Sequence, residues 1–150
     1  MANIFHEDFR DFLTALNKAE VRYILVGGYS VVLHGYSRTT GDMDIWVERT
    51  SENYLHIKKA FETFGMPVFD MTEENFLSHP IWDVFTFGTP PVAIDIMIKL
   101  KGLNFDEVYN RSIYFEDDDL KIRTINRADL ILAKKNAGRA KDINDLENLG

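Results

Sequence analysis

The sequence predicts an α/β or α+β fold, with a mixed central β-sheet flanked by helices. Two kinds of segment indicate this. Short apolar runs such as "RYILV" and "VAIDIMI" are typical of buried strands. Between them lie segments whose apolar residues recur at three- and four-residue steps, as in helices. With 150 residues, 45% of them hydrophobic, and neither a repeat nor a linker, the chain is expected to form one domain over 1–150.

The first half of the chain is expected to alternate helices and strands. The predicted helices each carry one apolar face and span 7–19, 29–34 and 51–64. The predicted strands span 22–26 and 43–48. Paired glycines end the first strand, Ser51 is expected to cap the third helix, and Gly65 to close it.

The second half adds strands and ends in helices. A short helix is expected to start after Thr72. The predicted strands span 82–87 and 92–98, joined by a turn at 88–91, and a hairpin follows over 112–125 with its turn at Asp117 to Asp119. The segment 127–149 is expected to be helical with a break at Gly138. The domain therefore divides into a sheet core, 1–125, and C-terminal helices, 126–150.

Composition narrows the functional classes. The formal net charge of −7 disfavours non-specific DNA binding, which needs the opposite excess, but not a metal site, because clustered carboxylates attract cations. Cysteine is absent, which fits a reducing cytoplasm. No apolar run approaches the roughly 20 residues of a membrane span. The acidic N-terminus differs from a secretory signal, so a cytoplasmic location without a membrane segment is expected.

One aspartate lies inside the most strand-like run of the chain. Asp95 interrupts "VAIDIMI", where both strand faces are expected to be buried. An isolated carboxylate there is costly. It is tolerated if it is protonated, paired with a cation such as Arg38, or bound to a metal ion.

Two further aspartates precede another predicted strand. Asp42 and Asp44 face the same side, about 6.6 Å apart along an extended chain. Alone, they are explained by a turn and a solvated strand end. With Asp95 on a neighbouring strand, three carboxylates instead suit Mg²⁺ or Mn²⁺. Two such ions about 4 Å apart form the usual clamp for nucleotidyl transfer.

The glycines offer a place for an anion. Gly27 and Gly28 lie between a strand and a helix, so backbone N–H groups can approach a triphosphate there. The alternative is a tight strand-to-helix turn without a ligand.

Basic residues accompany the acids. Arg38 can neutralise Asp44 or contact a phosphate. The C-terminal helices carry a basic cluster made of Lys134, Arg139 and Lys141. These side chains either pair along the helix surface, as the spacings to Asp142 and Asp145 allow, or cover the acidic site and bind a phosphate oxygen.

Together these motifs resemble a known family. A strand, "GGYSVVLHG", "YSRTTG", "DMD" on a strand, and "AID" on a later strand follow in this order. The pattern resembles the nucleotidyltransferase superfamily of the DNA polymerase beta type. It is most similar to small bacterial members related to abortive-infection and toxin–antitoxin nucleotidyltransferases. The tail "LILAKKNAGRAKDINDLENL" resembles the helical ending of these members.

The resemblance implies roles for individual residues. It implies that Asp42, Asp44 and Asp95 hold the metal ions, that Asp95 can act as the base, and that Gly27 and Gly28 cradle the triphosphate. Many members have serine where this chain has Gly28. Backbone amides or the Ser30 hydroxyl would therefore have to replace the serine hydroxyl that contacts phosphate.

Two functions are consistent with the sequence. The first is a metal-dependent nucleotidyltransferase that moves a nucleoside monophosphate from a nucleoside triphosphate to a hydroxyl acceptor, with two Mg²⁺ or Mn²⁺ ions. The acceptor, whether RNA, protein or a small molecule, is left open. The alternative is a non-catalytic module that binds a nucleotide or a protein partner, as one half of a toxin–antitoxin pair.

Overall fold

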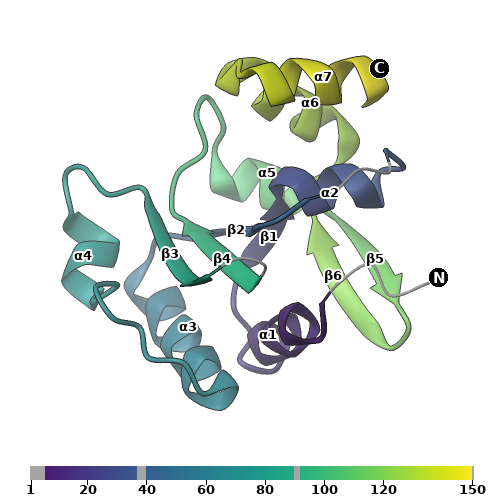
Figure 1. Ribbon diagram of the computed structural model, residues 1–150. Helices are drawn as coiled ribbons and strands as arrows, with labels where there is room; N and C mark the ends of the chain where they lie inside the picture. The colour runs from purple at the N-terminus through teal and green to yellow at the C-terminus, as the bar shows by residue number, and fades with distance from the viewer. Residues whose placement is uncertain (1–5, 37–39, 90–91, 150) are drawn as a thin grey trace.

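The computed structural model describes residues 6–36, 40–89 and 92–149. A six-stranded sheet lies between two groups of helices in these ranges (Figure 1). The helices are α1 (Glu7–Lys18), α2 (Gly27–Leu33), α3 (Ser51–Phe64), α4 (Glu73–Ser78), α5 (Phe105–Arg111), α6 (Arg127–Ala137) and α7 (Ala140–Leu149). The strands are β1 (Tyr23–Val26), β2 (Met43–Val47), β3 (Val84–Thr89), β4 (Val92–Met97), β5 (Ile113–Asp117) and β6 (Leu120–Thr124).

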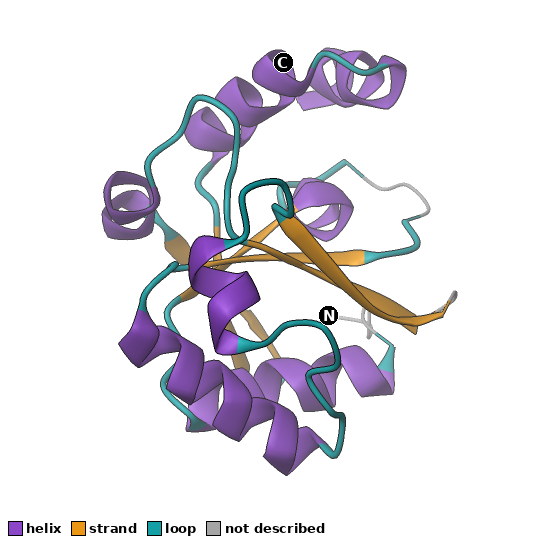
Figure 2. Cartoon of the chain, turned by 90° about the vertical axis from the view of Figure 1, so that its left-hand side faces the viewer, coloured by secondary structure: helices purple, strands orange, loops and turns teal. Residues whose placement is uncertain are grey.

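The sheet is mixed, as the sequence predicts. Its strand order is β3-β4-β2-β1-β6-β5. The pairs β1–β6 and β2–β4 are parallel, whereas the pairs β1–β2, β3–β4 and β5–β6 are antiparallel. Figure 2 shows helices above and below the sheet. The predicted fold class is therefore confirmed.

Each face of the sheet has its own core. Alternate residues of a strand point to opposite faces. On one face, Ile45 and its neighbours pack with Phe12 of α1 and Phe61 of α3. On the other, Trp46 packs in a cluster with Val108 of α5 and with residues of α6 and α7. Asp44 lies two residues before Trp46, so it points to the face that α5, α6 and α7 cover.

The register places the acids side by side. Asp44 of β2 is opposite Asp95 of β4 across the parallel pair. On the flanking strands, Val26 is opposite Asp44 and Thr86 is opposite Asp95. These residues form one row across four strands, and paired residues point to the same face. Two aspartates from distant parts of the chain therefore become neighbours.

Several element boundaries differ from the sequence expectation. Helix α2 begins at Gly27, and so includes both glycines. The N-cap of α3 is Thr50, whose side chain accepts a hydrogen bond from the Asn53 N–H, and Ser51 is the first helical residue. Of the predicted turn at 88–91, Gly88 and Thr89 belong to β3 and the rest lies outside the described residues.

Sequence periodicity missed α5. This helix is short and has Val108 as its buried residue, so it shows little of the periodic pattern. The signal in the sequence that could have indicated this helix is its N-cap residue, Asn104, whose side chain accepts a hydrogen bond from the Glu107 N–H. The break at Gly138 is confirmed, because this residue ends α6 with φ +65°. None of the helices in the described ranges combines the length and the apolar character that a membrane crossing requires.

Candidate functional site

The centre of the candidate site is a pair of carboxyl groups. Asp44 and Asp95 lie opposite each other on adjacent parallel strands, and the nearness of Asp95 contributes to a raised pKa of Asp44. The Thr86 hydroxyl donates to Asp95 Oδ1 at 2.7 Å. Asp95 therefore has partners on both neighbouring strands. Arg38, the cation considered for this role, lies outside the described residues.

The environment of the pair favours neutral Asp44. Burial, followed by the charge and the hydrogen bond of Asp95 and the charge of Asp42, raises the pKa of Asp44 to about 7. The charge of Lys141 acts in the opposite direction. Two adjacent carboxyl groups cannot both ionise cheaply in a partly buried place. Near neutral pH the pair therefore retains a proton or requires a cation.

A cavity of about 420 Å³ opens over this pair. Most of the residues that the sequence singled out line it: Gly27, Gly28, Asp42, Asp44, Asp95, Lys134, Arg139 and Lys141. Asp42 is exposed at its rim. In the described part of the chain, no three acidic, histidine or cysteine side chains are arranged as a finished metal site. The geometry is thus a carboxyl pair with a third carboxylate beside it.

The turn after β1 borders the acid pair closely. Gly27 has φ +69°, a conformation that favours glycine. A Cβ added to Gly27 would lie 2.1 Å from Asp44 Oδ2, so no larger residue fits there without displacing Asp44. The N-cap of α2 is Val26, which has no side-chain cap hydrogen bond. Backbone N–H groups of the first turn are therefore not occupied by a side-chain cap.

The structure does not bring Ser30 to the cavity, which corrects the sequence expectation. Its hydroxyl is fully buried and donates to the Gly27 carbonyl oxygen at 2.6 Å. The reason is helical geometry: a serine three residues into a helix can bond back to the preceding turn. Ser30 therefore supports the glycine turn instead of facing a ligand.

The basic cluster combines both alternatives that the sequence allowed. Lys134 Nζ lies 3.1 Å from Asp142 Oδ1 and 3.1 Å from Asp145 Oδ2, and all three residues are buried. Arg139 Nε lies 2.6 Å from Asp142 Oδ2, the predicted pairing. The same two cations nevertheless line the cavity with the exposed Lys141.

Asp142 is the central acceptor of this network. Burial alone would raise its pKa, but hydrogen bonds from Arg139 and Lys134 hold the pKa of Asp142 below its ordinary value. In the sequence, Asp142 could be recognised only as a possible partner of Arg139 on the helix surface. Its complete burial, which the structure shows, identifies it as the centre of the network. It connects the two cations that border the acid pair.

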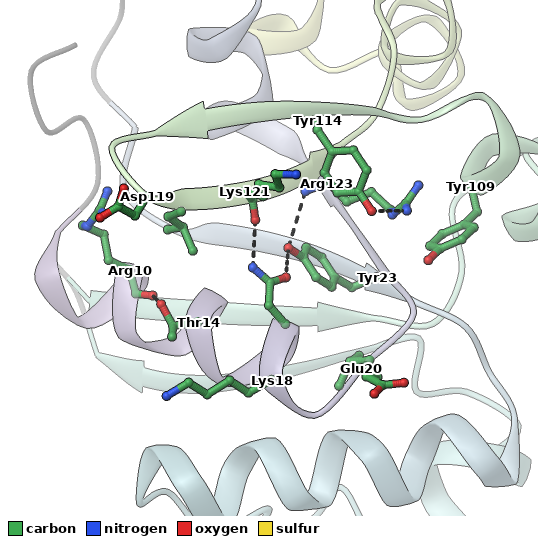
Figure 3. Close-up of a pocket in the computed structure, with 13 residues that line it drawn as sticks. Arg10, Thr14, Lys18, Glu20, Tyr23, Tyr109, Tyr114, Asp119, Lys121 and Arg123 are labelled. Carbon is green, nitrogen blue, oxygen red and sulfur yellow. Dashed lines mark hydrogen bonds between the residues drawn. The ribbon is translucent and has the colours of Figure 1, made fainter.

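The cavity over the acid pair is smaller than another cavity of the molecule. A larger cavity of about 760 Å³ lies around Tyr23, at the other end of β1 (Figure 3). None of the site residues predicted from the sequence lines it. The acid pair and the glycine turn therefore identify the smaller cavity as the candidate reaction site.

Comparison with known proteins gives a consistent result. Residues 5–150 match the model of a family described as "Nucleotidyltransferase of unknown function (DUF6036)". No curated protein sequence matches the chain.

Solved structures share the fold at low identity. The lincosamide antibiotic adenylyltransferase LnuA, solved with lincomycin bound, is 18% identical with a TM-score of 0.58, over 98% of this chain and 97% of that one. A predicted nucleotidyltransferase from Thermotoga maritima is 15% identical with a TM-score of 0.57, over 93% of this chain and 88% of that one. At such identities the likeness shows a shared nucleotidyltransferase fold.

The raised pKa of Asp44 predicts a pH-dependent stability. Its folded pKa of about 7 exceeds the ordinary value of 3.8, so ionisation opposes folding. This contribution is fully favourable below the ordinary value and is lost as the pH rises through about 7. In EDTA, the wild-type Tm should fall between pH 5 and pH 8 more than the Tm of Asp44→Asn. The control Glu62→Gln, at an exposed position on α3, should follow the wild type; equal losses in all three proteins would contradict the assignment.

The close approach at Gly27 predicts a specific intolerance. Gly27→Ala combines positive φ with a clash against Asp44, so it should lower the free energy of unfolding by about 2 kcal/mol or more in urea denaturation. Gly41→Ala is the matched control beside the same cavity, because an added Cβ there meets nothing within 4 Å. It should change stability by less than about 0.5 kcal/mol. Similar losses in both variants would refute the close contact.

Proposed function

The chain belongs to the family of nucleotidyltransferases of unknown function (DUF6036), and from this premise we propose that it transfers a nucleoside monophosphate from a nucleoside triphosphate to a hydroxyl acceptor. The observation that carries the proposal is the Asp44–Asp95 pair beside the glycine turn. The nucleotidyltransferase resemblance predicted from the sequence is confirmed by the family match.

The residues at this cavity suit divalent metal ions. Asp42, Asp44 and Asp95 offer only oxygen ligands, which Mg²⁺ and Mn²⁺ prefer. The raised pKa of Asp44 marks a place where a bound cation would relieve repulsion between the carboxyl groups. We assign the binding of two such ions to these three residues. When bound, the ions supply neutralisation of charge on the reacting phosphate.

The chain itself orients the reaction. Gly27 and Gly28 leave room for the triphosphate against the first turn of α2. Asp95, whose Oδ1 accepts a hydrogen bond from Thr86, is the residue we assign to accept the proton of the acceptor hydroxyl. The hydroxyl oxygen then forms a bond to the α-phosphorus, and the bond from this phosphorus to the pyrophosphate oxygen breaks. Positioning and charge complementarity supply most of the acceleration in such transfers.

The basic cluster complements the leaving group. Lys141 and Arg139 are exposed at the cavity and can bind phosphate oxygens, whereas Lys134 is buried beneath them. Asp142 contacts both Lys134 and Arg139. It therefore acts as a positioning residue that orients Arg139 toward the phosphates and fixes Lys134 beneath it.

A non-catalytic role is the alternative. Gly28 stands where many relatives have serine, and the Ser30 hydroxyl is committed to the Gly27 carbonyl group. A weakened triphosphate site would suit a module that binds a nucleotide or a protein partner, as in a toxin–antitoxin pair. If the chain is an enzyme, its acceptor must be found. LnuA, which shares the fold, is named as an adenylyltransferase of lincosamide antibiotics, so small hydroxylated molecules should be tested beside RNA and protein.

Ligand-induced stabilisation tests the triphosphate site. A nucleoside triphosphate at 100 times its dissociation constant stabilises the folded state by about 2.7 kcal/mol. We expect a Tm increase of roughly 5–10 °C in thermal denaturation with Mg²⁺. The increase should require the metal, should vanish in Asp42→Asn/Asp44→Asn, and should persist in the surface control Glu52→Gln/Glu62→Gln. A wild-type protein unaffected by every triphosphate with Mg²⁺ would exclude a triphosphate substrate.

Transfer itself separates the two functions. A triphosphate labelled at the α-phosphate is incubated with Mg²⁺ and with RNA, protein or small hydroxylated acceptors. Label that becomes covalently attached, and that Asp95→Asn abolishes, supports the enzyme. Metal-dependent binding without attachment to any acceptor supports the binding module.

The positioning role of Asp142 predicts a kinetic effect. Asp142→Asn removes one carboxylate from two cations, one of them buried, and should cost about 3 kcal/mol of stability. Because Arg139 also loses the carboxylate that orients it, KM for the triphosphate should rise at least tenfold in steady-state assays. Asp129→Asn is the matched control. Like Asp142 of α7, Asp129 of α6 is a buried aspartate in an ion pair, but its partner is Arg111, which lies outside the cavity. Its KM should stay unchanged, and a parallel rise would reduce Asp142 to a structural role.

A further inference from the structure

The larger cavity of the molecule contains an organised group of polar and aromatic side chains. Tyr23, at the start of β1, lines this cavity, whereas Gly27, just beyond the end of β1, lines the reaction cavity. At about 3.3 Å per residue, the two places lie on the order of 10 Å apart. The cavity around Tyr23 has a volume of about 760 Å³, which is large enough for a nucleotide-sized ligand.

The cavity exists because two strands diverge. β1 and β6 share a single register pair, Leu25 with Thr124. Beyond it, side chains replace the strand ladder: the Arg123 N–H donates to the Tyr23 hydroxyl at 3.4 Å, and Asn17 Nδ2 donates to the Lys121 carbonyl oxygen at 2.8 Å. The Tyr23 hydroxyl in turn donates to Asn17 Oδ1 at 2.8 Å. Figure 3 shows these bonds as dashed lines among the side chains that line the cavity.

Cations surround the cavity in excess over acids. Arg10, Lys18, Lys121 and Arg123 line it, against Glu20 and Asp119. Arg10 is neutralised by the buried Asp117. Among the described residues, the other three cations form no ion pair. A protein with net charge −7 thus keeps three cations without an ion pair, one from α1 and two from β6, around one space.

One of these cations is held rigidly. The Arg123 guanidinium carbon lies 4.2 Å from the Tyr109 ring centre and 4.4 Å from the Tyr114 ring centre. Arg123 also donates to the Ser112 hydroxyl at 2.8 Å. The guanidinium group is therefore pre-organised at the wall, which lowers the entropy cost of binding an anion. Arg123 and Lys121 lie over the Tyr114 ring, at 4.4 Å and 6.0 Å from its centre, and Tyr114 is still 56% exposed, so the uncovered part of its side chain can contact a planar group.

We propose that this cavity binds a nucleotide unit, with its phosphate at Lys18, Lys121 and Arg123 and its base against Tyr114. Proteins that bind single-stranded nucleic acids combine cations that contact the phosphates with aromatic rings on which the bases stack. A free nucleotide and single-stranded RNA offer the same chemistry. Binding here involves neither the acid pair nor a divalent ion, so it is independent of the transfer reaction.

The test measures binding in EDTA, which removes divalent ions from the reaction cavity. Fluorescence anisotropy with a labelled single-stranded RNA oligonucleotide and calorimetry with AMP serve as the two arms. Lys18→Gln/Lys121→Gln should weaken binding at least tenfold, and should reduce the slope of log K against log salt for RNA by about 1.4. Both side chains are exposed, so this variant should fold normally.

Controls separate the outcomes. Lys58→Gln/Lys59→Gln makes the same charge change on the exposed surface of α3 and should leave binding intact. Asp44→Asn should also bind normally, which distinguishes this site from the transfer site. Binding of RNA alone would identify a strand site, and equal binding of AMP a free-nucleotide site. Absence of binding in both arms, or binding that Lys18→Gln/Lys121→Gln does not weaken, would overturn the proposal.

Discussion

The contact between Asp44 and Asp95 is the constraint around which the rest of the site is arranged. Two carboxyl groups on adjacent parallel strands repel each other when both are ionised, and burial increases the cost. The surroundings offset it: Thr86 donates to Asp95, and the charge of Lys141 favours ionised Asp44. Such a pair lowers the stability of the free protein and suits the proposed binding of cations, a common compromise between stability and function.

The C-terminal helices extend this arrangement outward. Asp142 holds Lys134 and Arg139 close to the acid pair, so opposite charges alternate from the sheet to the helices. Buried charges are tolerated when they are paired and hydrogen-bonded, and Lys134 and Asp142 meet both conditions. The same pairing fixes the contact between α6 and α7 and the direction in which the cations point. Helix packing and the proposed phosphate recognition therefore depend on the same side chains.

The proposed transfer and the proposed nucleotide site use opposite ends of one short strand. At the end of β1, Gly27 allows close approach to Asp44. At its start, Tyr23 bridges the gap to β6. Both features arise where regular pairing stops and backbone groups need other partners. A sheet with a short central strand thus provides two chemically different cavities.

The sequence by itself determined the mixed sheet, most helices and the acid and glycine motifs, because these depend on local patterns of apolar, turn and charged residues. It also offered the pairing of Arg139 with Asp142 as one of two alternatives, since that spacing is local. Tertiary structure alone decided that Asp44 is opposite Asp95, because register between distant strands is set by global packing. It also decided that Ser30 turns back to Gly27, and that the gap beside Tyr23 is open, because burial and strand divergence are properties of the assembled fold.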